Sequence, residues 1–474
     1  MNQVKSIFRN TSWMSFSQVI ISICSFLYTI LIARYLGVSD YGNVSFAISF
    51  TILMGVIIDL GMHTYITREI SKNKGLLDKT VNNLFFFKIF LAFILFFVSW
   101  ILLILMGCSH LTIIVTLIFT IEVVFMSMAG FFNAIFQAFE DLKYPSIGGI
   151  LNNGLLLLCV LLTMYWDLGI FAVAFSYTLG YFIFFVYLFF KYVQKFKLPK
   201  FEMDLPFIKK VVLGSLPFCL TNFFYLIYFS IDIVMLSTLS GDYAAGLYKS
   251  AYNIIIVFTA FFAVYQSSIF PVMSKFFKES QYLIKKSYEL SIKYLLLLLL
   301  PLCIFVFLYA RPLLDLIYSS QYSLAESAVK ILIWTVIILF VNGAASTLLN
   351  AIDKETVVTK VYMAAAIFNV VINFILIPIL SYDGAAIATV LSEVFIFILF
   401  ILEIFKTEYK PGFGLLKVVL KLLFANAILF LTLYFLNASF WIAIPLTCII
   451  YAIILFLARI IDDDDKYIFH ELLR

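Results

Sequence analysis

The composition of this 474-residue chain excludes a soluble globular protein. Hydrophobic residues make up 64% of the sequence and charged residues only 12%, with a mean hydropathy of +1.08, whereas soluble domains carry about 25% charged residues. The formal net charge of +5 does not point to nucleic acid, because in a membrane protein the position of Lys and Arg relative to the bilayer decides their meaning. At about 20 apolar residues per span, the length predicts about fourteen spans and no large aqueous domain.

Fourteen apolar runs follow one another along the chain. Lys5 and Arg9 precede the first run, which is a full span long and lacks a small-residue cleavage signature, so we expect an uncleaved first helix. Short turns at 165–169 and 381–384 separate two pairs of runs, and their Asp and Gly residues suit tight helical hairpins. The runs cover residues 11–33, 42–62, 82–107, 111–137, 146–165, 168–190, 211–237, 244–270, 288–309, 327–349, 359–380, 384–405, 414–436 and 439–459.

The distribution of Lys and Arg predicts the orientation of these spans. If the N-terminus is cytoplasmic and the spans alternate, the inner segments hold 27 of the 32 basic residues. The outer segments hold only Arg34, Lys249, Arg311 and Lys330, and Lys88 lies inside a span. This is a strong positive-inside pattern. We therefore predict a multi-pass protein of the cytoplasmic (inner) membrane with both termini in the cytoplasm.

A weak internal repeat relates the two halves of the chain. The pattern Gly-x4-Gly-x4-Ala occurs at 37–47 and again at 241–251, an offset of 204 residues, and two further matches have offsets of 213 and 215. A six-span repeat preserves orientation, so the halves would be related by an axis along the membrane normal. We predict an all-α integral membrane protein of about 14 transmembrane helices, with two six-helix bundles related by a pseudo-two-fold axis and two extra C-terminal helices.

Four parts are expected along the chain. Residues 1–195 form the N-terminal six-helix bundle, and 196–210 form a basic cytoplasmic linker. Residues 211–406 form the C-terminal six-helix bundle, and 407–474 hold two extra transmembrane helices and an acidic cytoplasmic tail.

Charged residues inside the spans are the candidate functional residues, because burying a charge in hydrocarbon costs about 2.5–3.5 kcal/mol on insertion scales. Glu122 and Glu393 lie near the middle of spans four and twelve. Asp59 lies near the inner end of span two, Asp232 near the outer end of span seven, and Lys88 about two turns into span three. A central polar cavity would accommodate all five. Alternatively, Lys88 extends to the inner head groups, and the two aspartates hold helix ends near the interface.

No enzyme or metal motif accompanies these charges. The sequence has no phosphate-binding loop, its three histidines (His63, His110 and His470) lack zinc spacing, and its six cysteines form no CxxC pair. His63 lies one turn from Asp59. We expect no cofactor, no metal and no enzymatic activity.

Four segments together resemble one membrane protein family. They are the ARYLGxxxYG sequence at 33–42, the DLG and TRE sequences within 59–69, the segment 232–251 and the segment 369–393. Their order and spacing resemble the O-antigen/polysaccharide flippase-like family (polysaccharide biosynthesis exporters) of the multidrug/oligosaccharidyl-lipid/polysaccharide exporter superfamily. The resemblance extends from about residue 10 to residue 405. Peptidoglycan-precursor flippases of that superfamily carry cations within the first span. Here Arg9 and Arg34 only flank it, which argues against that branch.

The resemblance implies a function and its partners. Such proteins are similar in having two six-span bundles around a V-shaped cavity. They move an oligosaccharide linked to a polyprenyl pyrophosphate from the inner to the outer leaflet by alternating access, for O-antigen, lipopolysaccharide or other surface polysaccharide. The resemblance also implies H⁺ or Na⁺ coupling and association with polysaccharide polymerase and chain-length proteins, and no nucleic-acid partner.

We assign hypothetical roles to seven residues on this basis. A pyrophosphate needs cations, and a coupling ion needs carboxylates. The substrate-binding candidates are Arg34, Lys88 and Lys249, and the ion-coupling candidates are Asp59, Glu122, Asp232 and Glu393. For Arg34 and Lys249 the alternative is a solvated surface charge.

Two other functions stay open at this point. A cation-coupled drug or small-molecule antiporter of the same superfamily would share the architecture and differ in cargo. A membrane-embedded polysaccharide polymerase or glycosyltransferase would need a large extracytoplasmic loop to hold its acceptor, and the predicted outer loops are all under twenty residues long.

Overall fold

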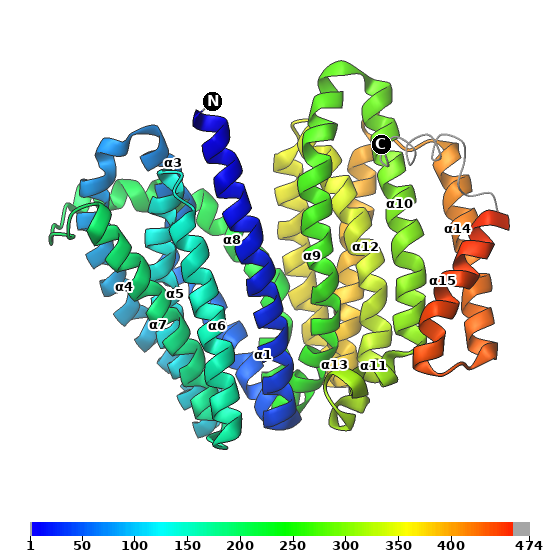
Figure 1. The fold of residues 1–474 in the computed structure, drawn as a ribbon, viewed down its shortest axis with the longest axis horizontal. Helices are drawn as coiled ribbons and strands as arrows, with labels where there is room; N and C mark the ends of the chain where they lie inside the picture. The colour runs from blue at the N-terminus through cyan, green and yellow to red at the C-terminus, as the bar shows by residue number, and fades with distance from the viewer. Residues whose placement is uncertain (1, 458–474) are drawn as a thin grey trace. The chain divides into compact units, whose positions relative to one another are not determined.

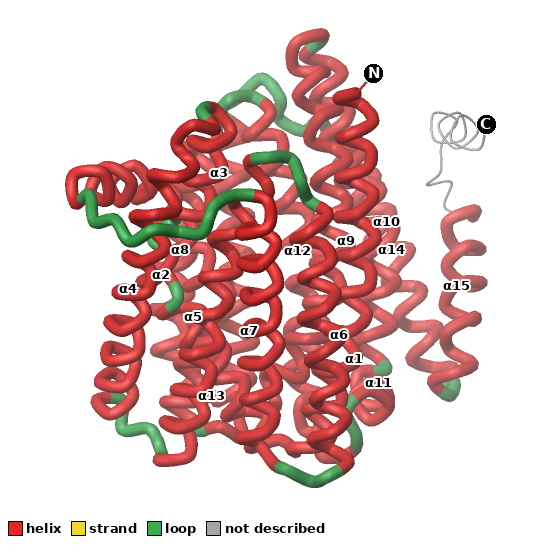
Figure 2. Tube along the Cα trace, turned by 60° about the vertical axis from the view of Figure 1, so that its left-hand side comes forward, coloured by secondary structure: helices red, strands yellow, loops and turns green. Residues whose placement is uncertain are grey.

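A computed structural model describes residues 2–457, and every regular element in that range is a helix, which confirms the all-α prediction (Figure 2). The elements are α1 (Asn2–Met54), α2 (Val56–Asp59), α3 (Met62–Lys72), η1 (Lys74–Leu76), α4 (Leu77–Leu105), α5 (His110–Ala138), α6 (Lys143–Tyr165), α7 (Gly169–Lys195), α8 (Leu205–Ser240), α9 (Asp242–Glu279), α10 (Gln281–Leu308), α11 (Ala310–Ile317), η2 (Ser320–Ala325), α12 (Glu326–Ala351), α13 (Glu355–Phe405), α14 (Phe413–Leu436) and α15 (Phe440–Leu457).

Eleven stretches of the described chain are long and apolar enough to cross a membrane. Two of them, Trp13–Lys72 and Glu355–Phe405, contain 60 and 51 residues. As straight helices these would be about 90 and 77 Å long, far more than the hydrocarbon core of about 30 Å. Each is interrupted by a residue with positive φ, Gly37 (73°) in α1 and Ser381 (52°) in α13. Figure 1 labels both helices, α1 in the first unit and α13 in the second. The exact number of fourteen spans stays a prediction.

Both predicted hairpin turns lie where the sequence placed them. Ser381 breaks α13 inside the predicted 381–384 turn, and α6 ends and α7 begins around the 165–169 turn. In the 165–169 turn, Asp167 has φ of 50°. The Tyr35 hydroxyl donates to Asp167 Oδ1 at 2.9 Å and accepts from the Gly169 N–H at 2.8 Å. A side chain of α1 therefore fixes the α6–α7 hairpin.

The chain divides into two compact units, residues 1–249 and 250–474. In the first unit α5 packs against α7, α1, α3 and α4, and α8 packs against α1 and α3. In the second unit α12 packs between α10 and α13, and α14 packs against α10 and α15. The predicted division at 196–210 stays a prediction, and the predicted acidic tail lies outside the described residues.

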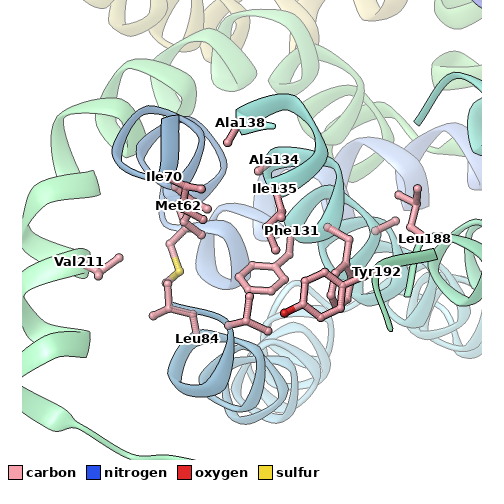
Figure 3. Packing of buried hydrophobic residues seen from close by; sticks show 14 of the residues in the cluster. Met62, Ile70, Leu84, Phe131, Ala134, Ile135, Ala138, Leu188, Tyr192 and Val211 are labelled. Atoms are coloured by element: carbon pink, nitrogen blue, oxygen red, sulfur yellow. The ribbon is translucent and has the colours of Figure 1, made fainter. Parts of the chain in front are cut away.

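One of the apolar core clusters of the first unit lies where α3, α4, α5 and α7 meet. Met62, Leu84, Phe132 and Ile135 are fully buried there, and Tyr192 is 1% exposed. Figure 3 shows these helices projecting their side chains into one cluster. Because interiors of this density resist volume changes, the core holds these helices in fixed relative positions beside the polar site described below.

A polar network fixes the loop 196–204 along the start of α4. Asn82 Nδ2 donates to Glu202 Oε1 at 2.8 Å, and Asn82 Oδ1 accepts from the Lys200 N–H at 2.9 Å. Asn83 is fully buried and its Oδ1 accepts from the Asp204 N–H at 2.6 Å. The segment predicted to be a linker is therefore bonded to the first unit along its length.

Two glycines of the predicted repeat let α1 and α9 meet backbone to backbone inside the first unit. A Cβ added to Gly42 would fall 1.7 Å from the Asp242 carbonyl oxygen, and a Cβ added to Gly246 would fall 2.0 Å from the Val38 carbonyl oxygen. Real Cβ atoms essentially never show contacts under 3.0 Å. The buried Asn43 side chain, next to Gly42, donates to Asp242 Oδ2 at 3.2 Å. This contact requires glycine at both positions.

Candidate functional site

A broken helix places Asp59 in the first unit. The four-residue α2 ends at Asp59, and Leu60 and Gly61, with φ of 47° and 73°, separate it from α3. A Cβ on Gly61 would fall 2.5 Å from the Cys219 backbone nitrogen, so the glycine allows α8 to approach. Non-helical backbone at membrane depth is tolerated only where protein buries it or where it lines a water-filled cavity. Discontinuous helices of this kind commonly form transport sites.

A cavity of about 610 Å³ lies beside this break, within the range of about 300–1,000 Å³ that is typical of ligand pockets. By contrast, a hollow of about 590 Å³ between α4, α5 and α7 is lined only by apolar side chains, as expected for a surface that faces lipid. The cavity is lined by Ile52, Gly55, Val56, Asp59, Gly61, His63, Thr64, Val123, Met126, Ser127, Gly130, Phe218, Asn222, Tyr225 and Leu226.

Lys88 lies behind the wall of this cavity and is bonded to two of its lining residues. Its Nζ lies 3.3 Å from Asp59 Oδ1 and donates to Ser127 Oγ at 2.6 Å. The Lys88 side chain is 1% exposed and that of Asp59 is 30% exposed. Asp59 therefore stands between the ammonium and the cavity. The structure joins two predicted site residues that the sequence had placed in different roles.

Glu122 lies one turn from the cavity residue Met126 on α5 and is 7% exposed. It interacts electrostatically with the hydroxyls of Tyr28, Tyr177 and Tyr181. In the first unit, Asp59 is thus half-buried and paired with a cation, whereas Glu122 is buried among tyrosines.

The remaining two carboxylates are also buried, and each accepts a hydrogen bond. Asp232 is 4% exposed, and its Oδ2 accepts from the Tyr248 hydroxyl at 2.8 Å. Glu393, in the second unit, is 5% exposed, and its Oε2 accepts from Asn342 Nδ2 at 2.7 Å. The structure places Glu393 in a different unit from Asp59 and Glu122.

The other two predicted cations do not line the cavity. Arg34 is exposed on α1, three residues before the bend at Gly37, and Lys249 is half-buried on α9. Neither belongs to the cavity wall. Of the three predicted substrate-binding residues, Lys88 is bonded to that wall.

Sequence reasoning missed the uncharged polar residues of the site. Ser127, Thr64, Asn222 and Tyr225 line the cavity but resemble many other polar residues in the spans. A usable signal was the pair of glycines at 55 and 61 that flank Asp59, because glycine weakens a helix by about 1 kcal/mol. In the described part of the chain, no group of three or more His, Cys, Asp or Glu residues is placed to hold a metal ion.

Comparison with known families gives matches over most of the chain. The family described as polysaccharide biosynthesis protein matches residues 7–277, which is more than half of the sequence. A second family, MatE, matches residues 217–375.

Two curated archaeal proteins are similar to part of the chain. An uncharacterised membrane protein of Methanocaldococcus jannaschii is 27% identical over 176 residues, which are 37% of this chain and 34% of the relative. A probable low-salt glycan biosynthesis flippase of Haloferax volcanii is 24% identical over 162 residues, or 34% of each chain. The matched region spans about a third of the length of these relatives.

Solved structures share the fold. The lipid II flippase MurJ in an inward closed conformation superposes with a TM-score of 0.78, at 16% identity, over 98% of this chain and all of that chain. A multidrug resistance transporter of the MATE family, in an inward-facing conformation, gives a TM-score of 0.66 at 16% identity over 84% of this chain and 98% of that chain.

Proposed function

Because the chain belongs to the polysaccharide biosynthesis protein family, we propose that it is a flippase for polyprenyl-pyrophosphate-linked oligosaccharide repeat units. It moves them from the inner to the outer leaflet of the cytoplasmic membrane by alternating access, for O-antigen or other surface polysaccharide. The role is that of a transporter and not of an enzyme. A similar protein of Haloferax volcanii carries the name of a glycan biosynthesis flippase, which supports this proposal.

The observation that carries the proposal is a cavity with several polar groups in its wall and a buried cation directly behind that wall. Lys88 lies behind Asp59 and Ser127 at the wall of this cavity. A pyrophosphate head group needs a cation to replace part of its hydration, and ammonium groups bind phosphate as point charges. The hydroxyl and amide groups of the wall suit sugar hydroxyls. The lipid tail stays in the bilayer, and Arg34 and Lys249 contribute further positive charge.

Ion coupling is the second part of the proposal. Asp59, Glu122, Asp232 and Glu393 are carboxylates inside the apolar runs, and three of them are at least nine-tenths buried. Intramembrane carboxylates mark ion pathways and proton relays, and the MATE-like fold supports coupling to H⁺ or Na⁺. If variants carrying Glu122→Gln and Glu393→Gln both transport at the wild-type rate, the coupling proposal is wrong.

The test of the flippase proposal is genetic and chemical. The gene is deleted in its native host, and lipid-linked oligosaccharides are measured in each leaflet together with surface polysaccharide. We expect complete repeat units to accumulate in the inner leaflet while surface polymer is lost. The Lys88→Met variant should restore about tenfold less transport than the wild type or worse. Lys195→Met is the control, because Lys195 pairs with Asp141 on the surface, away from the cavity.

A second candidate function is a cation-coupled drug antiporter. The MatE match over 217–375 and the MATE structures of similar fold favour it. In that case the deletion would leave surface polysaccharide unchanged and raise sensitivity to cationic drugs. That pair of results would replace the flippase proposal.

A further inference from the structure

The positive charge of the buried Lys88 ammonium is balanced by the Asp59 carboxylate in this structure. Asp59 Oδ1 lies 3.3 Å from Lys88 Nζ, and Asp59 lines the cavity whereas Lys88 does not. An anion entering the cavity therefore meets a carboxylate first. The Asp59–Lys88 pair has no net charge, so it gives no Coulombic attraction to a head group until one partner changes. The cation that the proposed function needs is thus present, but it is already paired with Asp59.

We propose that the cavity binds an anionic diphosphate group together with one proton, which Asp59 accepts. Protonation turns the Asp59 carboxylate into a neutral acid and frees the Lys88 ammonium, and a diphosphate oxygen then takes the place of the carboxylate. The proton comes from hydronium in the solvent, so one O–H bond breaks there as one forms on Asp59, and no other covalent bond changes. When the anion leaves, Asp59 loses the proton and pairs with Lys88 again. This inference rests on the proposed function and adds a condition for occupying its head-group site.

Charge balance supports the uptake of a proton. With Asp59 ionised, a doubly charged diphosphate beside Lys88 gives the site an excess of two negative charges. With Asp59 neutral, the excess is one. Uncompensated charge among membrane-spanning helices is costly, so the protonated arrangement is favoured when the anion binds. Ser127 Oγ accepts a hydrogen bond from Lys88 Nζ in the structure, and in the proposed cycle this bond holds the ammonium at the wall while Asp59 changes partner.

Local geometry allows Asp59 to change partners without moving a long helix. Asp59 is the last residue of the four-residue α2, and Leu60 and Gly61 interrupt the helix directly after it. The Lys88 side chain, by contrast, projects from the middle of the regular helix α4 and is fully enclosed. The carboxylate is therefore the partner that moves, and the ammonium stays in place.

Other titratable groups near Asp59 define the rival acceptors of the proton. His63 is the main one, because it lines the same cavity and interacts electrostatically with both Asp59 and Lys88. Glu122 on α5 faces tyrosines instead. Among the described residues, the titratable and charged groups that interact with Asp59 are Lys88 from α4, His63 from α3 and Cys219 from α8. Tyr225 from α8 lines the same cavity.

The test measures anion affinity as a function of pH. The full chain in phosphatidylcholine nanodiscs is titrated by calorimetry with P1,P2-dimethyl diphosphate, a probe whose own acidic protons are lost far below neutral pH. For the wild type we expect affinity to rise about tenfold for each unit of pH decrease over the linked range, because one proton is bound per anion. Buffers of different ionisation enthalpy should show the uptake of one proton.

Variants assign the proton to a residue. Asp59→Asn should bind the probe with the low-pH affinity of the wild type at every pH, and Lys88→Met should not bind it. His63→Gln should keep the wild-type pH dependence, as should Asp141→Asn, which breaks the surface pair with Lys195. Because Asp59→Asn leaves Lys88 without its counter-charge, the double variant Asp59→Asn/Lys88→Met, which removes both charges, serves as the folded non-binding reference.

Failures of the two proposals are distinguishable. If the wild type binds the probe equally at all pH values, or if His63→Gln and not Asp59→Asn abolishes the pH dependence, the proton inference is wrong while the flippase proposal stands. If neither the wild type nor Asp59→Asn binds the probe at any pH, the head-group site itself is wrong and both proposals lose their basis.

Discussion

The backbone contact between α1 and α9 gives the sharpest prediction about stability. In Gly42→Ala the new Cβ would fall 1.7 Å from the Asp242 carbonyl oxygen, and in Gly246→Ala 2.0 Å from that of Val38. Real Cβ atoms essentially never show contacts under 3.0 Å, so the two backbones must separate by about 1 Å or more. Overpacking of this kind costs about 1–3 kcal/mol. Separation also stretches the 3.2 Å Asn43–Asp242 hydrogen bond beyond its limit, which costs roughly 0.5–1.5 kcal/mol.

The expected loss for either substitution is therefore about 2–4 kcal/mol in the free energy of unfolding. Steric trapping in bicelles measures that free energy, and the thermal midpoint in detergent gives the same ranking. Gly154→Ala is the matched control, because it lies within α6 with no atom within 4 Å of the added Cβ. There alanine should stabilise by up to about 1 kcal/mol through helix propensity. If Gly42→Ala is as stable as Gly154→Ala, the close backbone approach is wrong.

Three further predictions concern the loop 196–204 and the α6–α7 hairpin. Asn83→Ala removes the acceptor for the Asp204 N–H, so trypsin should cleave the folded protein faster at the lysines of this loop. An unchanged cleavage rate would show that this hydrogen bond does not fix the loop. The Lys79 ammonium and a backbone N–H of α8 hold the pKa of Asp204 below its usual value. The stabilising contribution of ionised Asp204 is therefore present above its unfolded-state pKa and is lost as pH falls through its folded-state pKa. In Asp204→Asn the thermal midpoint should change less with pH over that acid range than in the wild type. The same pH dependence in both proteins would count against the Lys79–Asp204 pair. Tyr35→Phe removes both hydrogen bonds to the hairpin and should cost about 1–3 kcal/mol, measured as above; no loss would mean that water replaces the hydroxyl fully.

Apolar length predicted the helices because a bilayer imposes it, whereas the orientation predicted from charge asymmetry stays a prediction. A span needs about 20 apolar residues, and its flanking Lys and Arg favour one side. The hairpin at Ser381 was predictable for a local reason, since Asp383 and Gly384 follow it. These features depend on neighbouring residues in the chain, so a single sequence contains them.

The partners of the site residues were not predictable in the same way. Asp59 and Lys88 are 29 residues apart and were assigned opposite roles, yet their charged atoms lie 3.3 Å from each other. A helix that is apolar all round gives no periodicity to show which face a charge shares with a neighbouring helix. The hydrogen bonds of Asn82 with the Glu202 side chain and the Lys200 N–H were missed. The sequence of a short polar residue near a loop does not show whether its side chain binds water or another part of the protein.

The contact between α1 and the start of α9 is self-complementary, because equivalent residues of the predicted repeat occur on both of its sides. Val38 and Asp242 occupy equivalent places in the predicted repeat, as do Gly42 and Gly246, each pair 204 residues apart. Gly42 meets Asp242, and Gly246 meets Val38, so each copy presents the same patch to the other, which defines an isologous contact. In this chain the two sides of the contact are separate residues, so Gly42→Ala changes one side and Gly246→Ala the other.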